Sequence, residues 1–246
     1  MAITAMKLKA ENDTKRLYHA ENNYTESIYS TAASKSGTYT FDSSTPICES
    51  YSIKQDASNA NARMYWTDTT VYSQGSTECY IRFNTLENHF NIFLHASNPY
   101  STGRLGVVLS SGNYYLIAGM YFDNPGITWY NLCDDVSNPF IVTTGVTYHF
   151  MMTWGSEGLK LFINGTLHAI NADCAGKNVY SGNDYWGIFL VASSAGTPWY
   201  AARATIDEWR FNTTERRGTW VKSIAGGPKY KINGVIYTSI ASIGGV

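Results

Sequence analysis

Residues 146–170 carry the clearest pattern of apolar and polar positions in the chain. Apolar side chains alternate with other side chains over residues 146–154 and again over residues 159–163. A period of two is typical of strands that turn one face to a core. Asn164-Gly165 then supplies two residues that tolerate positive φ, as a type I′ hairpin turn requires. The segment therefore predicts consecutive antiparallel strands, with Thr166–Ile170 as the last.

Shorter stretches of the same kind recur between turn residues along the rest of the chain, and no helical period persists over a long window. They predict further strands at Thr38–Phe41, Ile47–Ile53, Glu78–Phe83, Phe90–His95, Leu105–Ser110, Tyr114–Met120, Thr128–Leu132, Trp186–Ala192 and Thr205–Phe211. Residues 7–18 fit either a short helix or a polar arm. We predict an all-β fold, a two-sheet antiparallel β-sandwich.

Composition narrows the functional classes. The 246 residues suit one large domain, and only 15% are charged, with a net charge of -1. This balance gives no electrostatic reason to expect nucleic acid or an anionic membrane as partner. No apolar stretch is long enough to cross a bilayer, and the first residues lack the apolar run of a secretory signal. We expect neither membrane insertion nor an ordinary signal peptide.

The four cysteines are widely spaced and form no metal-binding pair. Free, buried thiols are favoured over disulfides on this spacing. They are Cys48, Cys79, Cys133 and Cys174.

Two segments resemble a known superfamily. After Trp154, residues 158–167 read GLKLFINGTL, and residues 204–211 read ATIDEWRF. Together they resemble the hairpin and the later strand of laminin-G-like and pentraxin-like jelly rolls, which belong to the concanavalin A-like superfamily. The resemblance covers residues 41–215 and implies a concanavalin A-like jelly roll. It suggests a division into an N-terminal arm or first strand packed on the sandwich (1–37), the jelly roll (38–217) and a C-terminal docking tail (218–246).

The tail resembles another class of proteins. Residues 231–235 read KINGV and residues 243–246 read IGGV, similar to the ends of virion proteins of tailed bacteriophages. Isoleucines at a spacing of four would share one face of an extended strand. The predicted docking residues are Ile232, Val235, Ile236, Ile240 and Ile243.

Catalytic patterns are absent from the sequence. Glycosidases on this fold carry paired acidic residues in an E-x-D-x-x-E pattern, because hydrolysis needs two facing carboxyl groups. Asp207 and Glu208 are adjacent, which would place them on opposite faces of a strand. No nucleophile elbow occurs either. We predict that the chain is not an enzyme.

Two loop-flanked groups have the inventory of a glycan site, in which an aromatic face stacks on a sugar ring beside amide or carboxylate partners. The alternative is that their aromatic side chains fill the core or a subunit interface. The candidates are Trp129, Tyr130, Asn131, Asp134, Asp135, Trp199 and Tyr200. Asp134 and Asp135 could also ligate calcium, although a local turn role is favoured for them. No other cofactor or metal is expected.

These features lead to one main prediction with two alternatives. The tail favours a non-enzymatic virion structural protein of a tailed bacteriophage, in capsid decoration or in the tail or fibre. Its partners would be other virion proteins or copies of itself, and the exposed loops could also contact host surface glycans. The alternative is a carbohydrate-binding or adhesion domain of a bacterial surface or secreted protein, which would be extracellular or on the cell surface. The third is a glycoside hydrolase or lyase on the same fold.

Overall fold

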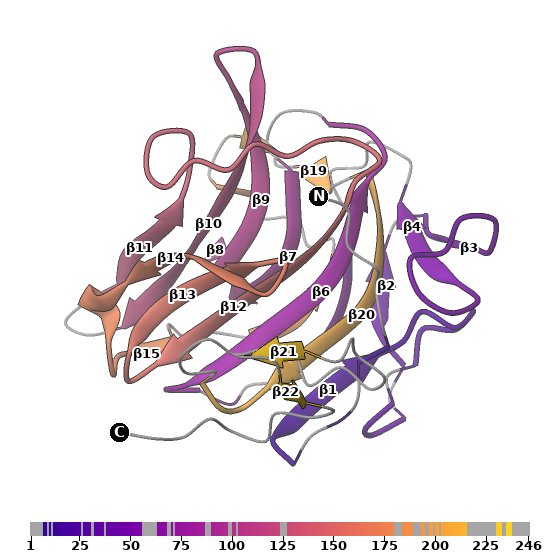
Figure 1. Cartoon of the computed structure of the whole chain (residues 1–246), viewed down its shortest axis with the longest axis horizontal. Coiled ribbons are helices and arrows are strands. Elements are labelled where there is room, and N and C mark those ends of the chain that lie inside the picture. The colour runs from indigo at the N-terminus through magenta and orange to yellow at the C-terminus, as the bar shows by residue number, and fades with distance from the viewer. Residues whose placement is uncertain are drawn as a thin grey trace.

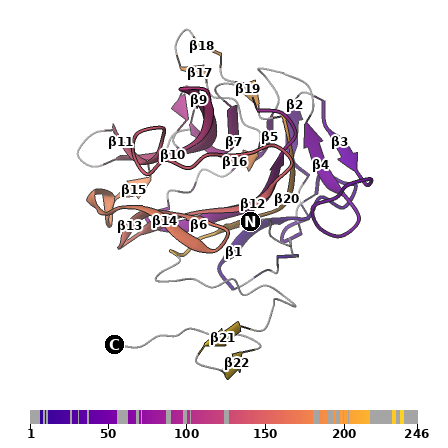
Figure 2. The same ribbon diagram turned by 45° about the horizontal axis from the view of Figure 1, so that its top comes forward.

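The computed structural model confirms the predicted fold class, because the chain forms a sandwich of two large, mainly antiparallel sheets (Figure 1). Figure 2 shows the two sheets as separate layers. The structure describes residues 7–8, 10, 12–25, 27–30, 32–36, 38–55, 63–67, 70, 72–86, 90–97, 100–101, 103–123, 127–179, 184–188, 193–194, 197–198, 200–201, 203–215, 230–232 and 235–237.

The eight-stranded sheet has the strand order β14-β13-β12-β6-β20-β4-β3, and β1 adds to it by pairing with β20. Its strands are β1 (Thr14–Tyr18), β3 (Thr40–Asp42), β4 (Ser52–Gln55), β6 (Gly75–Phe83), β12 (Thr147–Gly155), β13 (Gly158–Ile163), β14 (Thr166–Asn171) and β20 (Ala204–Asn212). Only β1 in this sheet lay outside the predicted strands.

The ten-stranded sheet has the order β11-β10-β9-β7-β16-β5-β2, with β15 on β10 and with β8 and β19 on β7. Its strands are β2 (Ser34–Ser36), β5 (Arg63–Thr67), β7 (Phe90–Ser97), β8 (Tyr100–Ser101), β9 (Gly103–Ser110), β10 (Asn113–Asp123), β11 (Ile127–Cys133), β15 (Asn178–Val179), β16 (Asp184–Ile188) and β19 (Tyr200–Ala201). A short 3-10 helix (Ala172–Cys174) follows β14, and β17 (Ser193–Ser194) pairs with β18 (Thr197–Pro198).

The predicted run of strands over residues 146–170 is confirmed. β12 pairs with β13, and β13 pairs with β14. The turn between β13 and β14 has φ values of 53° at Asn164 and 81° at Gly165, as a type I′ turn requires. The Asn164 side chain also accepts a hydrogen bond from the His149 N–H at 2.9 Å. The turn is thereby tied to β12 as well as to its own hairpin.

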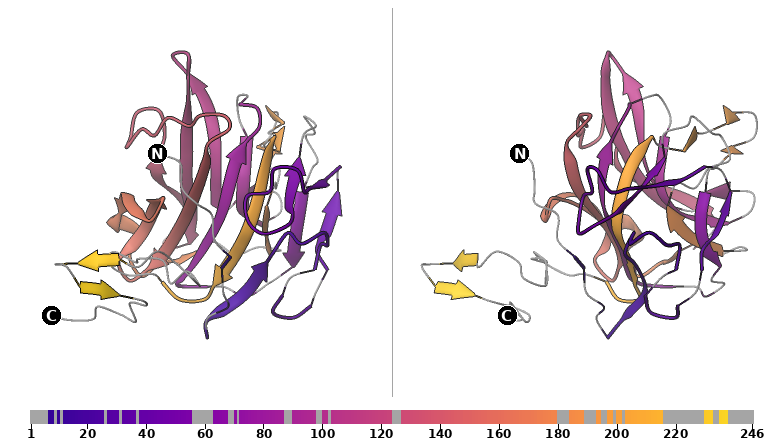
Figure 3. Two further views of the ribbon diagram at one scale, coloured as in Figure 1. Left: turned by 45° about the vertical axis from the view of Figure 1, so that its right-hand side comes forward. Right: turned by 90° about the vertical axis from the view of Figure 1, so that its right-hand side faces the viewer.

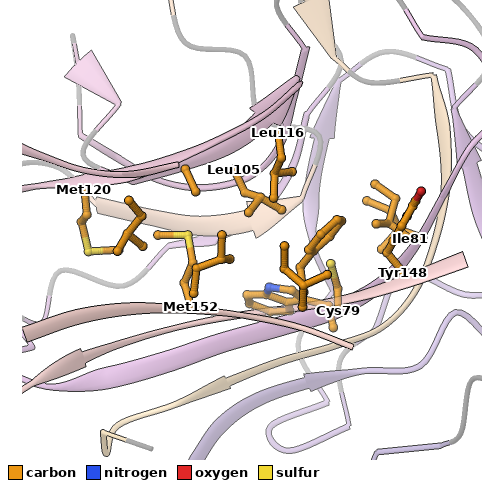
Figure 4. Packing of buried hydrophobic residues seen from close by; sticks show 14 of the residues in the cluster. Cys79, Ile81, Leu105, Leu116, Met120, Tyr148 and Met152 are labelled. Carbon is orange, nitrogen blue, oxygen red and sulfur yellow. The ribbon is translucent and has the colours of Figure 1, made fainter. Parts of the chain in front are cut away.

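The core lies between the two sheets. Tyr148 and Met152 reach into it from β12, while Leu116 and Met120 come from β10 (Figure 4). The alternation predicted for β12 is therefore correct on its inner face. Trp209 of the eight-stranded sheet stacks on Trp66 of the ten-stranded sheet, with ring centroids 5.0 Å apart.

The outer face of the eight-stranded sheet is buried as well, which a half-buried alternation would not predict. Met151, on the opposite face of β12 from Met152, is only 1% exposed. Near Tyr80, residues of the N-terminal arm form a second small core on this face. Its members are Leu8, Leu17 and Tyr80, with Ile28 and Ile47 packed against them.

Some predicted strand limits were wrong. Ile47–Ile53 was expected to be one strand, but residues 47–50 form a bend and β4 begins at Ser52. The Ile47 N–H donates to the Ser52 hydroxyl, so this backbone group bonds a side chain rather than a neighbouring strand. Of the predicted strand Trp186–Ala192, the part after Ile188 lies outside the described residues.

The tail forms its own hairpin from β21 (Tyr230–Ile232) and β22 (Val235–Tyr237), apart from the large sheets (Figures 2 and 3). Ile232 pairs with Val235, so Ile232 and Ile236 do not share one extended strand as predicted. The chain reverses between them. Ile240 and Ile243 lie outside the described residues. Docking by this tail stays a prediction.

All four cysteines are buried and none is bonded to another. Among the described residues, no helix is long and apolar enough to cross a membrane.

Candidate functional site

Trp129 lies on the outer face of the ten-stranded sheet, the face turned away from the core. Its partner across the β10–β11 pair is Tyr121, and both alternate with residues that enter the core, such as Met120. The indole lies against Gly119 so closely that a Cβ added there would be 2.3 Å from Cζ2 of Trp129. A glycine at this position of β10 therefore lets the ring lie against the sheet.

Arg104 completes this group from the neighbouring strand. It is the register partner of Gly119 in the β9–β10 pair, and its guanidinium carbon lies over the Trp129 ring, 5.1 Å from the centroid. Tyr121 meets the same indole edge-on at 4.9 Å between centroids. We call Arg104, Gly119, Tyr121 and Trp129 the Trp129 patch. Both Trp129 and Arg104 are partly exposed.

Burial lowers the pKa of Arg104, whereas the nearby Tyr121 raises it. The guanidinium stays protonated at neutral pH, because its ordinary pKa lies far above that range. The patch therefore presents a partly desolvated cation supported by an aromatic ring, an arrangement that stabilises charge through the ring quadrupole.

Tyr130 does not belong to the same surface as Trp129, so the predicted grouping of these neighbours is wrong. Tyr130 pairs with Met120 and packs against the core, with its ring 5.6 Å from that of Phe122. Lys177 lies over its ring and donates to its hydroxyl. The reason is strand alternation, which sends consecutive side chains to opposite faces.

Asn131 and Asp134 form a local network at the end of β11. The Asn131 side-chain amide donates to Oδ2 of Asp134 at 2.6 Å. The other oxygen of Asp134 accepts the backbone N–H groups of Val136 and Ser137. These bonds close the turn after β11, as the favoured local role predicted. Asp135 is exposed.

The remaining predictions concern a metal site and the neighbouring residues Trp199 and Tyr200. No cluster of three or more histidine, cysteine, aspartate or glutamate side chains that could hold a metal occurs among the described residues. The backbone of Tyr200 lies in β19, which runs parallel to β7 opposite Phe90. Trp199 lies outside the described residues.

Asp207 and Glu208 do not lie on opposite faces of β20, contrary to the sequence prediction. Glu208 has a φ of 55°, and the register of β20 against β6 shifts between Asp207 and Arg210. This bulge breaks the alternation on which the prediction was based. Both carboxylates turn to the N-terminal arm, where they contact the consecutive residues His19 and Ala20.

The two carboxylates anchor separate segments of chain. Glu208 accepts the Leu8 N–H at 2.6 Å and lies 2.8 Å from Nδ1 of His19. Asp207 accepts from the Cys48 N–H at 3.1 Å and from the Ser52 hydroxyl at 2.8 Å. Both acidic residues are 0% exposed. They hold the arm and the bend before β4 against the sheet.

Burial raises the pKa of Asp207 to about 8, with a further contribution from the charge of Glu208. Hydrogen bonds from Ser52, Ala20 and Cys48 oppose this rise. Burial also raises the pKa of Glu208, against the effect of His19.

A second buried polar group has no signal in the sequence. Glu78 of β6 accepts two hydrogen bonds from Arg210 of β20, and its other oxygen lies 2.7 Å from Nε2 of His149 on β12. Burial would raise the pKa of Glu78, but Arg210 and His149 lower it well below its usual range. The three side chains come from adjacent strands far apart in sequence, so no local motif marks them.

Another cation–aromatic contact lies on the N-terminal arm. Tyr29 is 55% exposed, and Lys15 and Arg16 lie 5.5 and 4.9 Å from its ring centroid. This group resembles the Trp129 patch in composition, but its aromatic ring comes from a turn, whereas its two cations come from β1.

Comparison with known proteins supports the fold. No family model and no curated protein matches the sequence. The structure is similar to domain 4 of AbnA, a GH43 extracellular arabinanase from Geobacillus stearothermophilus, solved in complex with arabinotriose. The TM-score is 0.60 at 16% identity, over 82% of this chain and 93% of that one.

Two further structures match over part of their length. The binding domain of botulinum neurotoxin DC, in complex with SialylT, gives a TM-score of 0.55 at 12% identity over 84% of this chain and 49% of that one. Trypanosoma rangeli sialidase gives 0.54 at 9% identity, over 85% and 32%. The chain thus spans about half of the toxin domain and a third of the sialidase. These matches show a jelly-roll-like β-sandwich.

Proposed function

We propose that the chain is a non-catalytic, glycan-binding β-sandwich whose ligand lies on the Trp129 patch. The observation that carries this proposal is the combination of a partly exposed indole, a tyrosine edge and a guanidinium on one face of a sheet. Aromatic rings offer apolar area for the C–H face of a sugar, while a few placed polar groups orient the ligand. Strands hold such groups more rigidly than loops do.

The similar structures support this proposal by analogy of fold. The AbnA domain was solved with arabinotriose, and cell entry of botulinum neurotoxin type C is described as dependent upon interaction with two ganglioside molecules. One fold hosts many functions, so the residues of the patch carry the proposal and the likeness in fold supports it. The carbohydrate-binding alternative is thus better supported than the virion role.

The absence of catalysis is part of the proposal. Glycoside hydrolysis needs two carboxyl groups that flank the scissile bond. Asp207 and Glu208, the acidic pair on β20, are fully buried and bonded to the N-terminal arm. They cannot meet a saccharide without release of that arm. Turnover of any saccharide that binds, lost in Asp207→Asn, would contradict this part of the proposal.

The test is a glycan array followed by isothermal titration calorimetry with the full chain. We expect at least one saccharide to bind and Trp129→Ala to weaken it by about tenfold or more, since buried aromatic contacts dominate binding energies. Tyr29→Ala is the matched control, because it removes an exposed aromatic ring with cations beside it from the arm. Thermal unfolding of each variant verifies the fold.

Two results would overturn the proposal. One is the absence of binding to every saccharide on the array. The other is an affinity that Trp129→Ala leaves unchanged.

The virion role predicted from the tail stays a prediction. A glycan-binding sandwich would serve on a virion, on a cell surface or as a secreted protein, and we propose one of these exposed locations. Mass spectrometry of purified particles tests the first of them, since a virion component must be present there in stoichiometric amount.

A further inference from the structure

We infer that the ligand of the Trp129 patch is an acidic saccharide, whose carboxylate pairs with Arg104 while its ring packs against Tyr121 and the exposed part of Trp129. This inference rests on the proposed function and names the class of ligand. It follows from how Arg104 is held.

The guanidinium of Arg104 is packed against the indole ring of Trp129. Its carbon is 5.1 Å from the Trp129 ring centroid, and the indole in turn lies against Gly119 and meets Tyr121 edge-on. Stacking restricts the planar guanidinium, so less rotamer entropy is lost when a ligand binds. A planar fork of N–H donors matches the two oxygens of a carboxylate.

The indole also differs from Tyr130, another aromatic ring that contacts a cation. Lys177 lies over the Tyr130 ring but donates to its hydroxyl as well. Tryptophan has a ring N–H donor and no acceptor. The contact with Trp129 therefore involves the face of the ring and no hydrogen bond between the two side chains.

Partial burial favours an anion over a neutral partner. Arg104 has lost water, as the lowered pKa of its guanidinium indicates. A charge-assisted hydrogen bond is stronger than a neutral one, and the difference grows as the local dielectric falls. A carboxylate should consequently gain more from this cation than a sugar hydroxyl does.

One acidic side chain shares this face of β10. Asp123 stands two positions after Tyr121, is exposed, and pairs across the sheet with Ile127. It would repel an anionic ligand weakly through water, and it provides a control for long-range electrostatics. Asp123→Asn and Arg104→Gln each remove one charge, of opposite sign, from the same face.

The test compares matched probes by titration calorimetry with the full chain. The pairs are 3′-sialyllactose with lactose, and trigalacturonic acid with its methyl ester. The two pairs distinguish a sialic acid from a uronic acid as the source of the carboxylate. We expect the acidic member of at least one pair to bind about tenfold tighter, as a charge-assisted bond predicts. The preference should weaken as salt is raised.

Variants assign the preference to Arg104. Arg104→Gln should abolish the preference, Arg104→Lys should keep part of it, and Asp123→Asn should leave it unchanged or raise it slightly. Trp129→Ala should weaken both members of the pair. The comparison of an acid with its ester on the wild-type chain needs no variant, so poor folding of Arg104→Gln would not remove the test.

The outcomes separate this inference from the proposed function. Equal binding of acidic and neutral members, lost in Trp129→Ala, would overturn the acidic-ligand inference and leave glycan binding intact. A preference that survives in Arg104→Gln would overturn the inference too. Binding to no probe and to no saccharide on the array would overturn both.

Discussion

Replacement of Arg210 by methionine would leave the carboxylate of Glu78 inside the protein without its main counter-charge. Both side chains are 0% exposed. Nε and Nη2 of Arg210 donate to the same oxygen of Glu78 at 2.9 and 2.6 Å, and His149 lies at the other oxygen. Methionine fills much of the volume of arginine but carries no charge. The loss should therefore be electrostatic rather than a cavity effect.

We expect Arg210→Met to lower the free energy of unfolding by about 3–5 kcal/mol at pH 7, the usual cost of breaking a buried ion pair from one side. The contribution of Glu78 to the pH dependence of the unfolding free energy should also change sign. In the wild type the folded-state pKa of Glu78 lies below the ordinary 4.5. The ionised Glu78 carboxylate therefore contributes to the stability of the fold above pH about 4.5, and this contribution is lost as the pH falls through the folded-state pKa.

In Arg210→Met, burial is expected to outweigh the remaining contact with His149 and to raise the pKa of Glu78 above its ordinary value. Stability is then lost as the pH rises through the raised pKa. The difference between variant and wild type should shrink as the pH falls from 7 toward 4. Urea denaturation followed by tryptophan fluorescence at several pH values measures both effects.

The matched control is Glu78→Gln combined with Arg210→Met, which removes the stranded charge and keeps a hydrogen-bonding side chain beside His149. We expect this pair to recover at least half of the loss. A loss below about 1 kcal/mol for the single variant, within the range of an exposed pair, would contradict a buried ion pair of this strength. So would a deficit that does not change with pH.

Three further variants test other parts of the structure. Asn164→Ala should cost about 2 kcal/mol, from its φ of 53° and its bond to the His149 N–H; urea denaturation should show a smaller loss for Asn164→Gly, and an equal loss would contradict this. The raised pKa of Asp207 makes the folded state more stable when this carboxyl group is protonated, so the melting temperature should fall as the pH rises from about 4 to 8. Asp207→Asn should make this fall smaller, and an unchanged slope would count against the raised pKa. Gly119→Ala should displace the indole of Trp129 and weaken saccharide binding in calorimetry, and unchanged affinity would mean that the position of the ring is unimportant.

Local patterns predicted the parts of the fold that local contacts determine. The strands over residues 146–170 follow from a period of two and an Asn164-Gly165 turn, and each pairs with its neighbour in sequence. β1 was not resolved from the sequence because it pairs with β20, nearly two hundred residues away. Its strand conformation depends on that distant partner rather than on its own pattern.

The grouping of the candidate site residues could not be predicted from the sequence. Trp129 was predicted as a glycan-binding residue, which stays a prediction, and Tyr130 was grouped with it although strand alternation separates the two. Arg104 was missed because it reaches Trp129 across an intervening strand. Gly119 was the available signal, since a glycine inside a strand often marks a close approach by another group.

NMR shows directly whether a bound saccharide touches Trp129. The chain has seven tryptophans, each with one indole N–H signal in a proton–nitrogen NMR spectrum, and Trp129→Phe identifies the signal of Trp129 by its loss. If the ligand lies on the Trp129 patch, this signal shifts saturably when a saccharide selected from the array is added. Saturable binding that shifts other indole signals and leaves that of Trp129 in place would contradict it.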